Sequence, residues 1–302
     1  MWRTGRQYAY SQNSIRSPQL VKRLLNKSRI SSSDIVIEIG AGKGIITREL
    51  ARKSKQVIAL EIDPELYKKL TYTFKDSKNV RILNKNFLKY SLPKHVYKVF
   101  SNIPFNFTSR IISKLLKTEN APLLAYLIIQ EEAAKKLMGS PRETQMSLLL
   151  KPLYSMKLSD RLKRSDFEPR PRVKTVFIEI EKLSTPFVEK KNYPEYRDFV
   201  VCVTTQWKPT LRKSLKKVFT YEQLKRLSSQ VQFNIDDAPL DLYFEQWLDL
   251  YKYYRSSVID CKKILVAGSY FRQECRNKRQ KKFYRFCERL NDVVYTTKGS
   301  QV

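Results

Sequence analysis

Three of the seven glycines in the chain fall within five residues and form the first candidate for chemistry. Gly40, Gly42 and Gly44 lie in the stretch EIGAGKG, which begins at Glu38, follows a short apolar run and precedes a helical pattern. Because glycine costs backbone entropy, its clustering in a glycine-poor chain marks a tight turn where the backbone can approach a ligand. The G-x-G-x-G spacing lacks the third-glycine position of a dinucleotide pyrophosphate loop, which favours a nucleoside cofactor without a diphosphate.

A carboxylate ends the next apolar run. Glu61 lies about 20 residues beyond the glycines, where a carboxylate can bind both hydroxyl groups of a ribose. Together with the glycine turn, Glu61 favours S-adenosylmethionine as the cofactor. The alternative interpretation is a structural turn followed by an ordinary surface glutamate.

The stretch SNIPF at 101–105 is the second candidate for chemistry. The exocyclic amine of a base is a poor nucleophile because its lone pair is delocalised into the ring, so it needs acceptors that hold its N–H groups. The side-chain oxygen of Asn102 and the carbonyl of Ile103 can supply two such acceptors. Pro104 fixes the backbone, and Phe105 offers a stacking face to an extruded base. A simple turn at the end of a strand is the alternative.

These candidates need a scaffold that brings the ends of several strands together. Short β-branched runs that alternate with helical patterns predict buried parallel strands and connecting helices. The predicted strands are 35–39, 57–61, 80–83, 98–101 and 123–129, with a late antiparallel strand over 173–180. The predicted helices of this part are 45–53, 64–74 and 109–116. This order implies an α/β fold with a doubly wound sheet, whose ligands lie at the carboxyl ends of the strands.

The charge of the chain indicates its partner. Lys and Arg number 59 against 29 Asp and Glu, a formal net charge of +30. Such a surplus implies a polyanion, and basic residues interleaved with Tyr and Phe along the whole chain favour nucleic acid over a membrane surface. Two segments are densest: 207–219 has five basic and no acidic residues, and 255–302 has twelve basic and four acidic ones.

A change of pattern divides the chain. From about Leu183 the strand signal vanishes, and helices are predicted over 196–206, 211–219, 221–229 and 244–254. We therefore expect a catalytic, cofactor-binding domain over 1–185, a helical RNA-binding domain over 186–255 and a basic C-terminal tail over 256–302.

Several classes of protein are excluded by composition. No apolar run approaches the roughly 18 residues of a membrane span, and the N-terminal segment lacks the apolar region of a signal peptide. A single histidine, His95, and cysteines without a CxxC pair support neither a metal site nor a disulfide framework. The cysteines are Cys202, Cys261, Cys275 and Cys287. We expect a cytoplasmic monomer without a metal ion.

The motifs together resemble those of the ribosomal RNA adenine N6-dimethyltransferases, which include the Erm-type 23S rRNA enzymes and the KsgA-type 16S rRNA enzymes. The resemblance extends from about Ser11 to Tyr254. It rests on SQNSI at 11–15, EIGAGKG at 38–44, Glu61, NIPF at 102–105 and DFEPRPRV at 166–173. It implies a Rossmann-like S-adenosylmethionine-dependent methyltransferase domain with a small C-terminal helical domain.

The resemblance also implies roles for single residues. The cofactor-binding set is Asn13, Ile15, Glu38, Gly40, Gly42, Glu61, Asn86 and Asn102. Asn13 and Ile15 match the N-terminal arm that closes over the cofactor. Gly40 matches the glycine against which the methionine moiety lies, and Glu61 matches the ribose ligand. Asn86 replaces the usual Asp that accepts a hydrogen bond from the cofactor adenine, so we expect weaker cofactor binding or a shifted contact.

On the substrate side, Asn102 matches the residue that orients the target amine, aided by the Ile103 carbonyl. Phe105 matches a stacking aromatic that is more often Tyr, and Phe167 matches a second stacking face. The segment QNSI at 12–15 stands where the family usually has QNFL.

The two branches of the family differ in the implied substrate. FEQW at 244–247, YRDFV at 196–200 and QWKP at 206–209 resemble the Erm type, whereas TLRKSLKKVFT at 210–220 resembles the 16S enzymes. The Erm type, which we favour, implies methylation of one adenine in the peptidyl-transferase region of 23S rRNA and resistance to macrolide, lincosamide and streptogramin B antibiotics. The alternatives are a KsgA-type enzyme of ribosome maturation and a non-catalytic nucleic-acid-binding factor of the same fold. A nicotinamide dehydrogenase explains neither NIPF nor the charge.

Overall fold

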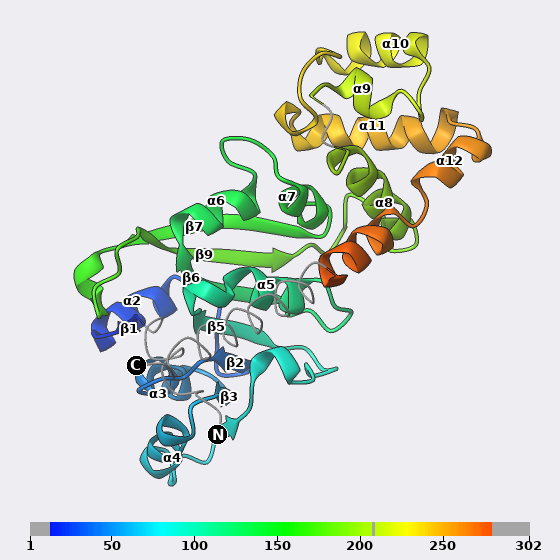
Figure 1. Cartoon of the computed structure of the whole chain (residues 1–302). Coiled ribbons are helices and arrows are strands. Elements are labelled where there is room, and N and C mark those ends of the chain that lie inside the picture. The colour runs from blue at the N-terminus through cyan, green and yellow to red at the C-terminus, as the bar shows by residue number, and fades with distance from the viewer. Residues whose placement is uncertain (1–12, 207–208, 280–302) are drawn as a thin grey trace, which may run out of the picture. The chain divides into compact units, whose positions relative to one another are not determined.

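The structure, a computed structural model, describes residues 13–206 and 209–279 (Figure 1). These residues divide into two compact units. The first falls within Met1–Pro141 and Leu150–Pro186, and the second within Arg142–Leu149 and Phe187–Val302. The chain thus passes into the second unit at Pro186, close to the expected boundary at 185–186. The earlier excursion of Arg142–Leu149 into the second unit was not expected from the sequence.

Within the described residues, the first unit is built on a seven-stranded sheet. In spatial order the strands are β4 (Val80–Asn84), β3 (Gln56–Glu61), β2 (Ile35–Ile39), β5 (Lys98–Asn102), β6 (Leu124–Gln130), β9 (Thr175–Lys182) and β7 (Tyr154–Leu162). The first five are parallel, whereas β9 is antiparallel to both β6 and β7. The strand order reverses between β2 and β5, and a sheet of this kind binds its ligands at the carboxyl ends of the strands beside that point.

Every predicted strand is present within two residues of its predicted bounds, and the late strand is antiparallel as predicted. Strand β7 was missed. It lies at the edge of the sheet, and a register shift between Leu158 and Asp160 interrupts its alternation of apolar and polar residues. An edge strand with such a bulge carries the weakest period-two signal.

The helices of the first unit connect its parallel strands. Helix α3 (Ile45–Lys53) follows β2, α4 (Pro64–Thr73) follows β3, and α5 (Thr108–Leu116) follows β5, all close to the predicted bounds. From the point between β2 and β5, the connections through α3 and α4 run in one direction along the sheet, and the connection through α5 runs in the other. Because such crossovers are right-handed, α3 and α4 lie on one face of the sheet and α5 lies on the other. The other elements are β1 (Ser14–Ile15), α2 (Pro18–Asn26), η1 (Phe87–Lys89), η2 (Phe105–Phe107), α6 (Glu131–Met138), η3 (Arg164–Asp166) and β8 (Phe167–Glu168).

The second unit is helical, as predicted. Its elements are α8 (Tyr193–Thr204), α9 (Leu211–Leu215), α10 (Tyr221–Val231), η4 (Pro239–Asp241), α11 (Phe244–Ser257) and α12 (Asp260–Val266), and residues 269–279 are also helical. The expected start of a tail at 256 therefore falls inside α11. Helix α9 ends at Leu215 rather than at the predicted 219, and the Val218 N–H then closes a tighter turn on the Leu215 carbonyl at 2.8 Å.

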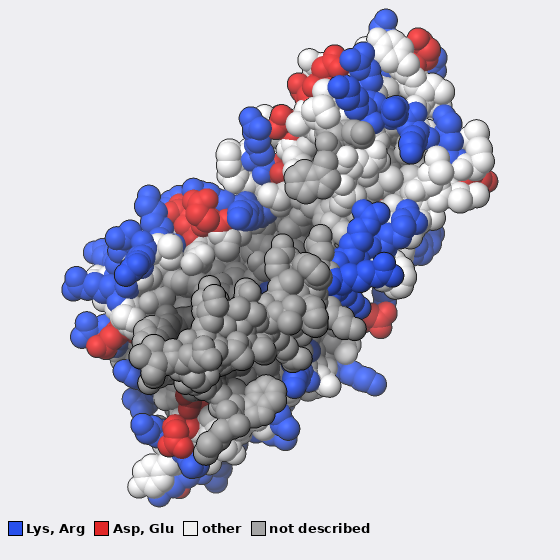
Figure 2. Space-filling model, in the orientation of Figure 1, with Lys and Arg blue, Asp and Glu red and all other residues white. Residues whose placement is uncertain are grey.

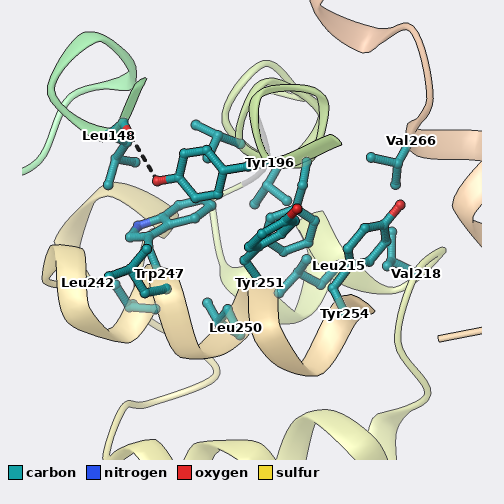
Figure 3. Packing of buried hydrophobic residues seen from close by; sticks show 14 of the residues in the cluster. Leu148, Tyr196, Leu215, Val218, Leu242, Trp247, Leu250, Tyr251, Tyr254 and Val266 are labelled. Atoms are coloured by element: carbon teal, nitrogen blue, oxygen red, sulfur yellow. Dashed lines mark hydrogen bonds between the residues drawn. The ribbon is translucent and has the colours of Figure 1, made fainter. Parts of the chain in front are cut away.

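Aromatic side chains fill the core of the second unit (Figure 3). Trp247 is fully buried, and its indole nitrogen donates to the Pro239 carbonyl at 3.1 Å. The Tyr196 hydroxyl donates to the Leu148 carbonyl at 2.8 Å (Figure 3). Leu148 and Leu149, which α7 (Gln145–Leu150) contributes, are 0% and 3% exposed in the same cluster. These leucines explain why the excursion of the chain belongs to this unit.

Candidate functional site

The glycine turn joins β2 to α3. Gly40, Gly42 and Gly44 have positive φ angles of 75°, 55° and 78°, a conformation that costs other residues about 1–2 kcal/mol. A Cβ added at Gly44 would lie 2.8 Å from Leu70 Cδ2 and 2.9 Å from Phe74 Cε2, so packing requires glycine there. A Cβ at Gly40 or Gly42 would meet no atom of the described residues within 4 Å. The first two glycines therefore border open space.

Glu61, at the end of β3, supports the same turn. Its carboxylate is 1% exposed, and Oε2 accepts from the Gly42 N–H at 2.8 Å while Oε1 accepts from the Asp63 N–H at 2.9 Å. A carboxylate offers about four acceptor positions, so two remain for the hydroxyl groups of a ligand. The bond between Glu61 and the glycine turn was not predicted from the sequence, because spacing along the chain does not give the distance between neighbouring strands.

Glu38 is a second buried carboxyl group beside the turn. It is 1% exposed, its Oε2 accepts from the Thr47 hydroxyl at 2.6 Å, and its Oε1 has no hydrogen-bond partner among the described residues. Burial raises the pKa of Glu38 to about 8; the Thr47 bond opposes this rise and the nearby Glu61 adds to it. The protonated form therefore predominates at neutral pH.

Asn102 ends β5 beside the glycine turn. The preceding Ser101 donates its hydroxyl to the Ile39 carbonyl at 2.6 Å, which ties the ends of β5 and β2 together. The Asn102 Nδ2 donates to the Asn13 carbonyl at 2.7 Å, and its Oδ1 is buried without a hydrogen-bond partner in the described part of the chain. An unsatisfied buried acceptor costs about 1–3 kcal/mol. This oxygen is therefore ready to accept from a ligand.

The N-terminal arm lies against the segment that contains Phe167. Strand β1 pairs antiparallel with β8, which places Ile15 opposite Phe167, and the Arg16 N–H donates to the Asp166 carbonyl at 2.9 Å. Phe167 is 0% exposed and belongs to a hydrophobic cluster that includes Ile15. The expectation that Phe167 offers a second stacking face is corrected, because its ring is covered by that cluster.

Three adjoining cavities meet at Gly40. The first has a volume of about 240 Å³, and the other two have about 40 Å³ each. Every residue predicted for the site except Phe167 lines at least one of them. These residues are Asn13, Ile15, Glu38, Gly40, Gly42, Glu61, Asn86, Asn102, Ile103, Pro104 and Phe105. The sequence motifs thus converge at the carboxyl ends of β2, β3 and β5.

Asn86 lines the 240 Å³ cavity and caps a short helix. Its Oδ1 accepts from the Leu88 N–H at 2.9 Å at the start of η1. The amide oxygen can accept one more bond, but the other terminal atom of the side chain is a donor rather than the second acceptor of an Asp. Asn86, which stands where the family usually has an Asp, therefore faces the cavity.

Other residues of this cavity were not predicted from the sequence. Lys85, Phe107 and Arg110 line it, and the Arg110 guanidinium lies 5.7 Å from the centre of the Phe107 ring. Two signals could have indicated them: Lys85 directly precedes Asn86, and Arg110 lies in the first turn of the helix after NIPF.

No helix in the described ranges has the length and apolarity to cross a membrane. Over the same residues, no three His, Cys, Asp or Glu side chains gather in a group that could hold a metal ion.

The strand order, the glycine turn after β2 and the carboxylate after β3 define a Rossmann-like methyltransferase fold with an added helical part. The fold is similar to that of a solved structure described as the crystal structure of 23S rRNA methyltransferase ErmE. The TM-score is 0.74 at 24% identity, and the match covers 81% of this chain and 100% of that one.

A family model described as ribosomal RNA adenine dimethylase matches residues 5–256. The chain belongs to this family, and it is an rRNA adenine N6-methyltransferase by class. It is 34% identical over 247 residues to an rRNA adenine N-6-methyltransferase of Staphylococcus aureus, covering 81% of this chain and 96% of the relative. It is 28% identical over 255 residues to ribosomal RNA small subunit methyltransferase A of Acaryochloris marina, covering 80% of this chain and 94% of that one.

Proposed function

We propose that the protein transfers one or two methyl groups from S-adenosylmethionine to N6 of a specific adenine in 23S rRNA. The observation that carries the proposal is the buried Oδ1 of Asn102, which has no hydrogen-bond partner among the described residues and lies beside the glycine turn of Gly40 and Gly42. The Asn102 oxygen supplies an acceptor for an amine, and the glycine turn leaves room for a cofactor.

The residues around Gly40 fit the cofactor. Glu61 retains two acceptor positions for ribose hydroxyls, and Gly40 and Gly42 present backbone without side chains to the space above the turn. Asn86 faces the 240 Å³ cavity, where its side-chain oxygen can accept a hydrogen bond from the amine of the cofactor adenine. When bound, S-adenosylmethionine supplies an electrophilic methyl group attached to a sulfonium.

Asn102 prepares the nucleophile. Because its Nδ2 is bound to the Asn13 carbonyl, its Oδ1 is held as an acceptor. This oxygen and the Ile103 carbonyl bind the two N–H groups of the adenine and direct the nitrogen lone pair out of the ring system. As the new N–C bond forms, the bond between the methyl group and the sulfonium sulfur breaks, and S-adenosylhomocysteine is the leaving group. Positive charge grows on the attacking nitrogen, and the two oxygens stabilise that charge until a proton leaves to water.

The target adenine must leave its stack before it reaches Asn102. Phe105 lines the cavity that also contains Asn13 and Asn102, which supports a role for its ring in stacking on an extruded base. Extrusion costs a few kcal/mol from a duplex and less from a loop or bulge. We therefore place the target in a single-stranded or bulged region.

The Erm-like motifs of the helical part support 23S rRNA as the substrate, with macrolide, lincosamide and streptogramin B resistance as the consequence. This function suits a cytoplasmic monomer, as expected from the sequence. The second candidate is 16S rRNA, as in KsgA-type enzymes, and the similarity to a small subunit methyltransferase favours it.

The test is transfer of labelled methyl groups to protein-free 23S rRNA and, in parallel, to unmethylated 30S particles. We expect label in the 23S rRNA. Asn102→Ala should lower transfer by about 100-fold or more, as loss of a group that stabilises transition-state charge does, while RNA affinity is retained. Label only in the 30S particles would establish the second candidate. No label in either substrate would refute the proposal, and equal loss of RNA binding and transfer would refute the role of Asn102.

A further inference from the structure

The chain continues beyond the part that the family model matches, which ends at residue 256. In the described structure, residues 257–279 contain the end of α11, helix α12 and a second helical stretch over 269–279. Gly268, with φ of 73°, forms the turn between the two helices. These residues, 257–279, are called the C-terminal extension, and none of them lines the three cavities at Gly40.

The C-terminal extension is fixed to α8 by specific contacts. The Asp198 carboxylate accepts from the Gly268 N–H at 2.7 Å and from the Tyr270 N–H at 2.9 Å. The Arg197 guanidinium lies 3.9 Å from the centre of the Tyr270 ring. Val266 is 1% exposed. A carboxylate at the first N–H groups of a helix and a cation over an aromatic ring are both stabilising contacts, so the extension has a defined position on this helix.

A basic cavity lies between the C-terminal extension and α8. Its volume is about 380 Å³, and it includes the cationic side chains of Lys217, Arg272 and Arg276. The other lining residues are Cys202, Thr205, Gln206, Val218, Leu265, Ser269 and Gln273. None of the described lining residues is acidic, and Figure 2 shows Lys and Arg side chains gathered over the helical stretch 269–279.

Among the described residues, the three cations of the cavity form no ion pair with a carboxylate. Arg272 donates to the Ala267 carbonyl at 2.8 Å and to the Ser269 hydroxyl at 2.8 Å, which are neutral partners. Within the described residues, no carboxylate pairs with Lys217, Arg272 or Arg276. A guanidinium held in a fixed orientation beside two further cations matches the oxygens of a phosphate group.

We propose that the C-terminal extension and α8 form a binding site for a backbone phosphate of the RNA substrate. This inference rests on the proposed function for its ligand, since RNA is the polyanion that the enzyme must bind. A free phosphate offers the same oxygens, whereas RNA also explains the formal net charge of +30. The extension thus adds an anchor for RNA to the part of the chain that is shared with the family.

The test compares two double variants of the full chain with equal change of charge. Lys217→Gln with Arg276→Gln removes two cations of the cavity, and Lys225→Gln with Lys278→Gln removes two exposed cations that do not line it. Arg272 is left in place because it also binds Ala267 and Ser269. All four substituted side chains are exposed, so both variants should fold.

The measurement is affinity for a 23S rRNA fragment at several salt concentrations. The cavity variant should bind about tenfold more weakly than the wild type at low salt. The slope of its log affinity against log salt concentration should correspond to about one to two fewer phosphate contacts. The control variant should change much less in both quantities. Equal weakening in both variants would overturn the proposal. If inorganic phosphate stabilises the wild type but not the cavity variant, and RNA affinity is the same in both, the site binds a small anion and the RNA assignment is overturned.

Methyl transfer by the wild type separates this inference from the proposed function. Weaker RNA binding by the cavity variant, with no transfer by the wild type, supports the phosphate site and refutes the proposed function. Transfer by the wild type, with equal RNA binding by the cavity variant, refutes the phosphate site and leaves the proposed function intact.

Discussion

Replacing Gly40 and Gly44 separately with alanine tests whether the glycine turn is kept open for a ligand. The two residues have nearly the same backbone conformation, with φ of 75° and 78°. An L side chain in this region costs about 1–2 kcal/mol at either position. Any further difference between the variants must therefore come from what surrounds the added methyl group.

The surroundings differ in a way that gives the expected magnitudes. At Gly44 the new Cβ would lie 2.8 Å from Leu70 and 2.9 Å from Phe74, and such overpacking adds about 1–3 kcal/mol, for a total loss of about 2–5 kcal/mol. At Gly40 it would meet nothing within 4 Å, so the loss stays at about 1–2 kcal/mol. With about 2–4 °C per kcal/mol, Tm should fall by about 4–20 °C for Gly44→Ala and by about 2–8 °C for Gly40→Ala.

Ligand binding should show the opposite order. Gly40 lines all three cavities, so the methyl group of Gly40→Ala would occupy space that we assign to the cofactor. Calorimetric titration with S-adenosylmethionine should show affinity weakened by about tenfold or more for Gly40→Ala. Folded Gly44→Ala should bind nearly as the wild type does. Equal losses of unfolding free energy, or unchanged affinity in Gly40→Ala, would refute the reasoning.

Three further predictions concern single side chains. The pKa of Glu38, about 8 when folded, exceeds its ordinary value of 4.5, so the folded state binds an extra proton between these pH values. Unfolding free energy should therefore fall by up to about 1.4 kcal/mol per pH unit from pH 5 to 8, and denaturation of Glu38→Gln should lack this component. Asn86→Asp keeps the hydrogen bond to the Leu88 N–H and adds a second, charged acceptor. Calorimetry should therefore show S-adenosylmethionine bound about tenfold more tightly. Unchanged affinity would refute the assignment of Asn86 to the cofactor site. Trp247→Ala should cost about 3–5 kcal/mol in denaturant unfolding, because it empties a fully buried position and leaves the Pro239 carbonyl unpaired, whereas Trp247→Phe should cost less.

The sequence was sufficient to predict where the candidate site is. Gly40, Glu61 and Asn102 each follow an apolar run directly, so each could be placed at the carboxyl end of a strand. Because the strands of βαβ units are parallel, their carboxyl ends lie at one edge of the sheet. The pattern of the strands and a general rule of sheet topology were thus enough to predict the position of the site without the individual contacts.

Other features depend on pairings between distant segments, which local patterns do not encode. The burial of Phe167 follows from its pairing with Ile15 in a ladder of two residues per strand, too short to give an alternating pattern. The position of Arg142–Leu149 in the second unit follows from tyrosine hydroxyls that bind the carbonyls of Leu148 and Leu149. In both cases, the sequence around one segment does not indicate which distant segment it contacts.

On the proposed mechanism, the hydrogen bond between Asn13 and Asn102 determines which polar atom of the Asn102 side chain faces the target amine. A carboxamide rotated by 180° would present N–H groups where it now presents oxygen, and would then repel the amine that it is proposed to bind. The Asn13 carbonyl, 89 positions earlier in the chain, accepts from Nδ2 and so selects one of these two orientations. On the proposed mechanism, an enzyme shortened past Asn13 would retain the whole NIPF motif and yet lose its fixed acceptor. On that mechanism, the contact between Asn13 and Asn102 must be in place before methyl transfer.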